Sequence, residues 1–405
     1  MKKIICFIAI LFNICYVYSQ KVIFIIADGI PADVVENAHL TNFNRIMQEG
    51  TYVRSHVGGD KGTYNQTPTI SAVGYNSLLT GTWVNKHNVW DNNINNQNYS
   101  YPSIFKLFKE QYPKKKIGIF STWLDNRTKL VGEGIAATNF LKFDDISDGY
   151  ELDTIQFPHD KTSKYIHLID EKVTTDAVKC IKEKAPDLSW VYLEFTDDMG
   201  HRYGDSPELA DALKNLDHQI GQLYDAILYR KTNFNEDWLI LITTDHGRDE
   251  KDGKGHGGQS LRQRSTWIVS NKKFNNYAYQ SYPAIVDLMP TIANFLSIPI
   301  SVPIQYEIDG VSLIGKVSVA QPQINIFQNT LDVSWQNFNE EGNVKIFMST
   351  SNNFNKNDTD NYILLGEFPV KQRNVAIDIS KYKSSFYKVV IEGKYNSINK
   401  WFEKK

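Results

Sequence analysis

Cysteine is scarce in this sequence, which has three cysteines in 405 residues. Two of them, Cys6 and Cys15, lie in an apolar segment at the N-terminus. If that segment is removed, Cys180 alone remains, and no internal disulfide can form. We therefore expect stability to come from core burial and bound metal.

An excess of charge of one sign is also absent, because 44 Lys and Arg stand against 46 Asp and Glu. No basic stripe indicates a nucleic-acid partner. With 41% hydrophobic and 22% charged residues, the composition is typical of soluble globular proteins and excludes wholesale disorder and a multi-span membrane protein. The length predicts two domains.

Long apolar runs are lacking except at the N-terminus, where two lysines precede a run from Ile4 to about Tyr18. The run ends at Val17-Tyr18-Ser19, with small residues at the two positions that a signal peptidase reads. It is shorter than the roughly 20 residues of a spanning helix, although a retained anchor is the alternative. We predict a signal peptide over residues 1–19 and a periplasmic or secreted bacterial protein, with no membrane span after cleavage.

An unbroken apolar strand is predicted from Lys21 to Ala27. Similar strands recur at 116–120, 190–195 and 238–243, separated by helical patterns such as 209–228. This alternation predicts an α/β fold with a mostly parallel sheet sandwiched by helices. Polar residues follow each strand at its carboxyl end, the edge where open α/β sheets bind ligands.

The pattern changes after the segment D-G-V-S-L at 309–313, where short alternating segments replace helical ones. Leu331, Val333 and Trp335 alternate with polar residues, which is typical of a β-sandwich. We predict a catalytic α/β domain over 20–316 and an all-β sandwich over 317–405. The segments L-D-V-S-W and Y-K-V-V-I-E-G resemble strands of a fibronectin type III module. Such modules bind carbohydrate or protein, or space domains, and the sequence leaves these roles open.

Six acidic and histidine residues lie just past the predicted strands or in a later G-H-G-G segment. They are Asp28, Asp197, His201, Asp245, His246 and His256. Mixed carboxylate and imidazole ligands suit Zn²⁺ or a similar divalent ion better than Ca²⁺, which prefers oxygen alone. We predict two ions, most simply Zn²⁺, each with an open position. One set is Asp28, Asp245 and His246, and the other is Asp197, His201 and His256.

Each of these residues also has a structural interpretation. An Asp that ends a strand, such as Asp28, is often a helix cap, and His201 alone could be a surface or core histidine. The pair Asp245-His246 is more specific, because acid and imidazole closing an apolar strand are unfavourable without a cation. Taken together, the six favour metal binding.

Five short segments occur in a characteristic order: I-A-D-G, T-P-T-I-S, D-D-M-G-H, T-D-H-G and G-H-G-G. In this order they resemble the alkaline phosphatase superfamily, especially its nucleotide pyrophosphatase/phosphodiesterase branch. The resemblance covers most of residues 21–315. It implies an alkaline phosphatase-like metallohydrolase domain that acts on a small-molecule phosphate ester.

The nucleophile of that branch, usually Thr, opens a helix and is followed at fixed spacing by Thr-Gly, His and Asn. This spacing identifies Ser71 as the nucleophile. The hydroxyls of Thr67 and Thr69 are alternatives, because a hydroxyl at either position could also reach a metal. The matching residues are Thr80-Gly81, His87 and Asn92. A structural reading, Ser71 as a helix cap, is compatible with this role because helix N-termini also attract phosphate.

The resemblance also implies a mechanism. The ion held by Asp28, Asp245 and His246 would bind the Ser71 oxygen and lower its pKa, and a covalent phosphoserine would form. The other ion would generate hydroxide to hydrolyse it. Asn92 and the backbone N–H of Ala72 would hold a non-bridging oxygen.

Two departures from the family pattern bear on the substrate. Ala72-Val73-Gly74-Tyr75 replaces the usual Pro-Asn-His after the nucleophile, and it also lacks the Pro and Arg that a sulfatase needs. Related monoesterases place a Lys and an Arg after a later strand. Here Arg127 is present as a predicted substrate-binding residue, but Asp125 stands where the Lys is expected. An acid there disfavours a dianionic monoester, so we expect a phosphodiesterase or nucleotide pyrophosphatase.

Two other functions remain open. One is an alkaline phosphomonoesterase, or a phosphonate or sulfate ester hydrolase of the same fold. The other is a non-catalytic surface binding protein in which the sandwich contacts carbohydrate or protein. The complete ligand set, together with Ser71 and Asn92, argues against the second.

Overall fold

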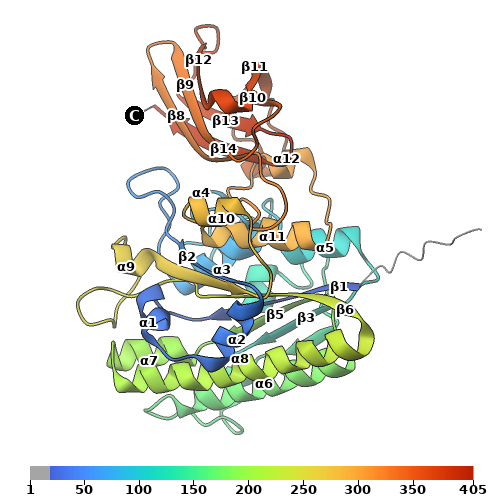
Figure 1. Ribbon diagram of the computed structural model, residues 1–405. Helices are drawn as coiled ribbons and strands as arrows, with labels where there is room; N and C mark the ends of the chain where they lie inside the picture. The colour runs from blue at the N-terminus through green and yellow to red at the C-terminus, as the bar shows by residue number, and fades with distance from the viewer. Residues whose placement is uncertain (1–18, 405) are drawn as a thin grey trace, which may run out of the picture.

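The computed structural model describes residues 19–404 (Figure 1). The predicted signal peptide therefore lies outside the described residues, except for Ser19, which begins strand β1. Within 19–404, no helix has the length and apolar character needed to cross a membrane.

A seven-stranded sheet with the order β2-β7-β6-β1-β5-β3-β4 forms the centre of the N-terminal region. Its strands are β1 (Ser19–Ala27), β2 (Thr51–His56), β3 (Ile117–Ser121), β4 (Asp145–Ser147), β5 (Leu188–Leu193), β6 (Glu236–Thr243) and β7 (Ser265–Ser270). β1 lies parallel to β5 and β6, and β3 lies parallel to β4 and β5. β7 runs antiparallel to β2 and β6. The predicted mostly parallel sheet is confirmed.

Helices cover both faces of this sheet (Figure 1). One layer consists of α1 (Ala32–Asn37), α2 (Thr41–Glu49), α6 (Lys164–Glu183), α7 (Phe195–Tyr203) and α8 (Pro207–Phe234). The other contains α3 (Ser71–Thr80), α4 (Val84–His87), α5 (Ile104–Gln111), α10 (Asn276–Gln280) and α11 (Leu288–Phe295). Two short helices, α9 (Leu261–Arg264) and α12 (Val302–Gln305), lie in connections.

Strand β1 is apolar from Val22 to Ala27, where both of its faces are buried. Ile23 and Ile25 belong to the core under α2, α6 and α8, whereas Phe24 and Ile26 belong to the core under α3, α5 and α11. Side chains of a strand alternate between faces, so a strand covered on both sides needs a continuous apolar run.

Helix α8 is longer than its apolar pattern predicted. Its start is set by Ser206, whose side chain accepts a hydrogen bond from the backbone N–H of Leu209 at 3.2 Å, and by Pro207 in the first turn. Ser at the N-cap and Pro at the first helical position are standard helix-start signals.

The C-terminal region consists of two antiparallel sheets, β11-β10-β13-β14 and β12-β9-β8, which confirms the predicted all-β part. The strands are β8 (Val319–Phe327), β9 (Thr330–Asn337), β10 (Asn343–Ser349), β11 (Ile363–Pro369), β12 (Asn374–Asp378), β13 (Phe386–Glu392) and β14 (Ser397–Glu403). Leu331, Val333 and Trp335 are buried between the sheets, as their alternation predicted.

We propose that residues 317–405 form the fibronectin type III-like module and that 20–316 form the catalytic domain. The hydroxyl of Tyr387 in β13 donates to the backbone oxygen of Tyr382 at 2.8 Å. A tyrosine bonded to the backbone a few residues upstream is a recurrent feature of immunoglobulin-like sandwiches and supports this proposal. The sandwich lies against the α3 and α4 side of the α/β domain (Figure 1).

Candidate functional site

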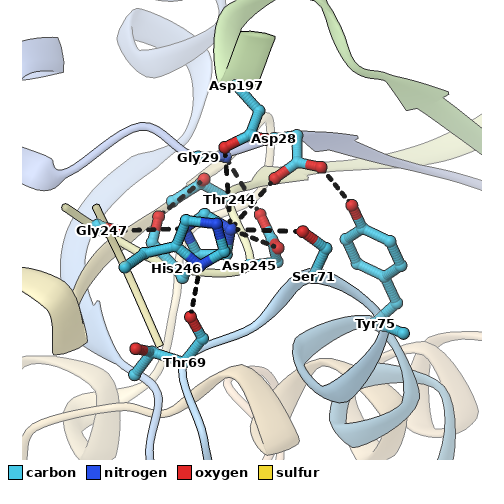
Figure 2. A network of polar contacts seen from close by, with 12 residues as sticks. Asp28, Gly29, Thr69, Ser71, Tyr75, Asp197, Thr244, Asp245, His246 and Gly247 are labelled. Atoms are coloured by element: carbon cyan, nitrogen blue, oxygen red, sulfur yellow. Dashed lines mark hydrogen bonds and ion pairs between the residues drawn. The ribbon is translucent and has the colours of Figure 1, made fainter. Parts of the chain in front are cut away.

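The six predicted ligand residues and Ser71 come from separate segments that meet beyond the carboxyl ends of β1, β5 and β6. Asp28 directly follows β1, and Asp197 lies in α7 just after β5. Asp245 and His246 follow β6, and Ser71 is the first residue of α3. Carboxyl ends of parallel strands share one edge of a sheet, so the topology brings these side chains together (Figure 2).

His246 lies at the centre of the first group. Its Nε2 is 3.4 Å from Asp28 Oδ1, 3.4 Å from Asp245 Oδ2 and 3.4 Å from Ser71 Oγ. Its Nδ1 lies 2.9 Å from the backbone oxygen of Gly247 and must donate to it. Burial lowers the pKa of His246, so the ring is neutral and Nε2 is unprotonated. A nitrogen lone pair, two carboxylate oxygens and a hydroxyl therefore face one point (Figure 2).

A second group forms around Asp197 and His201. They are four residues apart on α7 and share one helix face, with His201 Nε2 3.2 Å from Asp197 Oδ2. The Nε2 of His256 lies 3.0 Å from that of His201. The Nδ1 of His256 lies 2.9 Å from the backbone oxygen of Thr69, so Nδ1 is the donor, and Nε2 of His256 is the unprotonated nitrogen.

The donor atoms of both groups fit metal ions. Asp28 Oδ1 and Asp245 Oδ2 are buried and have no hydrogen-bond donor within residues 19–404. Burial, reinforced by the charge of Asp197, raises the pKa of Asp28 to about 7. Burial and the charge of Asp28 raise the pKa of Asp245 well above its usual value. Buried acceptors of this kind are costly unless a cation compensates them, and a mixed oxygen and nitrogen donor set matches Zn²⁺.

Two ligand groupings satisfy the distances between donor atoms. Asp197, His201 and His256 have ligand atoms within 4.8 Å of one another, and so do Asp28, Asp197 and His246. Asp197 thus lies within reach of both groups. The predicted division of ligands, with Asp245 beside Asp28 and His246, stays a proposal.

Two tyrosines that the sequence reasoning did not identify orient Asp28. The hydroxyls of Tyr75 and Tyr192 both donate to Asp28 Oδ2, the latter at 2.7 Å. Oδ2 is therefore occupied and Oδ1 is left to face the site (Figure 2). The available signal for Tyr75 was its position four residues after Ser71, on the same face of α3.

Arg248 is a third residue that was missed, although it stands two positions after His246. It is fully buried and donates from Nε to the backbone oxygen of Gly29 at 2.9 Å. Its Nη2 binds both the backbone oxygen of Asp197, at 2.7 Å, and the carboxylate of that residue. Burial acts to raise the pKa of Asp197, but the hydrogen bond from His201 and the charge of Arg248 outweigh it and hold this pKa below its usual value.

Gly200 leaves the space that Arg248 occupies. A Cβ there would lie 2.1 Å from Arg248 Nε. We expect Gly200→Ala to destabilise the protein by about 1–3 kcal/mol, since overpacking forces neighbours to move, and to weaken metal binding by displacing Asp197. Thermal unfolding and metal analysis measure both effects. In the control Gly366→Ala, only the Phe368 ring must move, so metal content is expected to stay unchanged.

The hydroxyls of Thr67 and Thr69, the two alternative nucleophiles, are bonded to backbone oxygens. Thr67 Oγ1 donates to the backbone oxygen of Asn65 at 2.9 Å, and Thr69 Oγ1 donates to that of Gly258 at 2.9 Å. Ser71 Oγ instead lies within the His246 group. The geometry therefore favours Ser71 over both threonines as the nucleophile.

Asn92 lies beside the start of α3, although it is 21 residues after Ser71. Its Oδ1 accepts the backbone N–H of Ala72 at 3.0 Å. That N–H was expected to face a phosphoryl oxygen directly. In the structure Asn92 satisfies it, because the first N–H groups of a helix have no partner within the helix.

Arg127 is held by acidic neighbours. Its guanidinium binds both carboxylate oxygens of Asp148, at 2.6 and 3.0 Å, and also Glu133. The predicted substrate-binding role of Arg127 has no support from these contacts and stays a prediction. Asp125 pairs with Lys129 at 2.7 Å, so its charge is partly balanced and the argument for diesters that rested on it is weaker.

The model of the family "Type I phosphodiesterase / nucleotide pyrophosphatase" matches residues 22–284. Venom phosphodiesterase CdcPDE of Crotalus durissus collilineatus is 26% identical over 234 residues, which cover 55% of this chain and 26% of the relative. A venom phosphodiesterase of Naja atra is 23% identical over 233 residues, covering 55% of this chain and 25% of the relative. The match thus spans about a quarter of the length of these curated relatives.

Among solved structures, human ectonucleotide pyrophosphatase/phosphodiesterase 5 aligns with a TM-score of 0.49 and 15% identity. The alignment covers 70% of this chain and 96% of that one. The family match over residues 22–284 includes more than half of the chain and confirms the resemblance inferred from the five segments. The protein belongs to the type I phosphodiesterase/nucleotide pyrophosphatase family, within the alkaline phosphatase superfamily.

Proposed function

We propose that this protein is a metal-dependent phosphoric ester hydrolase that prefers phosphodiesters and acts through a covalent phosphoserine at Ser71. One observation carries the proposal: Ser71 Oγ, His246 Nε2 and the unpaired oxygens of Asp28 and Asp245 converge on one point. Family membership agrees with this chemistry.

Two divalent ions are proposed, with zinc as the metal. Asp28, Asp245 and His246, together with Ser71, would hold one ion, and Asp197, His201 and His256 would hold the other. When bound, zinc would lower the pKa of the Ser71 hydroxyl and offset negative charge on the phosphoryl oxygens.

The residues of the chain supply the remaining steps. Ser71 Oγ gives up its proton to solvent and attacks phosphorus, so that a bond from Oγ to phosphorus forms while the bond to the leaving alcohol oxygen breaks. The leaving oxygen takes up a proton from solvent. Water then cleaves the phosphoserine, releasing the phosphate monoester and restoring the hydroxyl. The N-terminus of α3 favours the negative phosphoryl group. The Asn92 amide, whose oxygen accepts the N–H of Ala72, would donate from its nitrogen to a phosphoryl oxygen.

Hydrolysis of monoesters, phosphonates or sulfates is the second candidate function. The pairing of Asp125 with Lys129 supports this second candidate, because an acid whose charge is partly balanced repels a dianionic substrate less. A non-catalytic binding role is disfavoured by the completeness of the ligand set. A periplasmic or secreted location and a carbohydrate or protein contact through the sandwich remain proposals.

The substrate class can be tested with three p-nitrophenyl compounds: the phosphodiester, the phosphomonoester and the sulfate. With zinc present, we expect kcat/KM for the diester to exceed that for the others by at least about 10-fold, a difference of roughly 1.4 kcal/mol between transition states. A faster monoester would overturn the substrate preference. Absence of hydrolysis with all three would overturn the enzyme proposal.

A further inference from the structure

Strand β14 of the sandwich contacts the α/β domain on both sides of the nucleophile helix α3. Before α3, the loop between β2 and α3 meets β14 through Asp60 and Tyr64. After α3, helix α4 meets it through Lys86. Figure 1 shows the sandwich against this side of the α/β domain.

The first contact centres on Trp401. The ring of Tyr64 stacks on it, with centroids 5.5 Å apart and planes 13° from parallel. The Tyr64 hydroxyl accepts the backbone N–H of Trp401 at 3.1 Å. Next to this stack, Lys400 forms an ion pair with Asp60.

The second contact is a buried ammonium group. Lys86 is fully buried and donates to the backbone oxygen of Glu307 at 2.6 Å, to Asp309 Oδ1 at 2.6 Å and to Asn399 Oδ1 in β14 at 2.9 Å. These three acceptors use all three of its protons. Its Nζ also lies 5.2 Å from the centre of a Trp401 ring, so Trp401 contacts both sides of the nucleophile segment.

The loop between β2 and α3, which β14 contacts through Tyr64, leads directly to the site. Thr67 Oγ1 accepts the backbone N–H of Val84 at 3.3 Å, which joins the loop to α4. Two residues later, the backbone oxygen of Thr69 accepts the Nδ1 proton of His256. Movement of this loop would therefore reach a proposed metal ligand.

Helix α4, which β14 contacts through Lys86, leads to the site as well. His87, next to Lys86, lies with Nε2 3.0 Å from Ser77 Oγ on α3. Asn92, a few residues further, accepts the N–H of Ala72. Movement of α4 would therefore displace both α3 and Asn92, whose amide is proposed to bind a phosphoryl oxygen.

From these contacts we infer that the C-terminal sandwich is a positioning clamp for the nucleophile segment, with Trp401 held between Tyr64 and Lys86. The inference rests on the proposed function and adds to it a role for the sandwich in catalysis. None of the three residues touches the reacting atoms, so they are positioning residues. A shift of about 1 Å in such supporting groups can cost roughly 100-fold in rate.

The test uses the full protein with Tyr64→Ala, Tyr64→Phe and Leu331→Ala. Tyr64→Ala removes the stack and is expected to lower kcat about 10–100-fold, with KM within about 3-fold and metal content unchanged. Tyr64→Phe keeps the ring and is expected to keep kcat within about 3-fold of wild type. Leu331→Ala opens a cavity in the sandwich core, in a cluster of buried residues that does not include Trp401, so it should lower the Tm but leave kcat unchanged below that temperature.

Hydrogen exchange of the same variants separates failure of this inference from failure of the proposed function, since it needs no activity. Tyr64→Ala should speed exchange in peptides from 65–70 and 84–92, and Leu331→Ala should not. If wild type hydrolyses no phosphoester but this exchange pattern appears, the clamp stands and the proposed function falls. An active enzyme in which Tyr64→Ala changes neither kcat nor exchange, or in which Leu331→Ala lowers kcat equally, overturns the clamp.

Discussion

Replacing Ser71 by alanine is expected to lower kcat/KM for the p-nitrophenyl diester by at least about 1000-fold, because the attacking oxygen is lost. Asp28, Asp245 and His246, the three other proposed ligands of the adjacent ion, are unchanged in this variant. Metal content is therefore expected to stay close to that of wild type. Steady-state kinetics and metal analysis of the same sample measure both quantities.

Ser71→Thr is the matched control for this prediction. It keeps a hydroxyl at the start of α3 and supplies the residue that the family usually carries there. We expect its kcat/KM to stay within about 10-fold of wild type, the cost of fitting one methyl group. If Ser71→Ala is as active as wild type, Ser71 is not the nucleophile.

Removal of one metal ligand is the prediction with the next largest effect. His256→Ala takes away a ligand of the Asp197 group, and we expect the protein to retain one ion per chain instead of two. Activity should fall by at least about 100-fold, since one ion alone cannot offset the charge on both sides of the reacting phosphorus. Metal analysis after dialysis, followed by the diester assay, measures the change.

The exposed His218 on α8 offers a control, because His218→Ala removes an imidazole that lies outside the site and bonds to Gln222. Its metal content and activity should equal those of wild type. An unchanged ion count in His256→Ala would break the proposed division of ligands. Full activity of the wild type after chelation would exclude a metal-dependent reaction.

Much of the fold could be predicted because single segments carry its signals. The uninterrupted run in β1 required burial on both faces, and the alternation at Leu331, Val333 and Trp335 required a sandwich. The end of α8 was harder, since its last turns lie beyond the clear apolar pattern. The start of α8 is marked in the sequence by the capping Ser206 and by Pro207 in the first turn.

The residues of the candidate site differ in how clearly the sequence indicates them. Asp28 and Asp245 could be identified because each stands where an apolar strand ends, and strand ends of a parallel sheet converge. The substrate-binding role of Arg127 stays a prediction, because its position near a strand end does not reveal its partners. In the structure its guanidinium binds Asp148 and Glu133.

The sequence by itself determined the fold class, the family and the residues able to supply ligands and a nucleophile, because these depend on residue type, order and local period. The tertiary structure alone decided which atoms face one another. It showed that Tyr192 and Arg248 orient the carboxylates of Asp28 and Asp197, and that Trp401 reaches the segments around α3. Such contacts join residues up to hundreds of positions apart, and no local pattern encodes them.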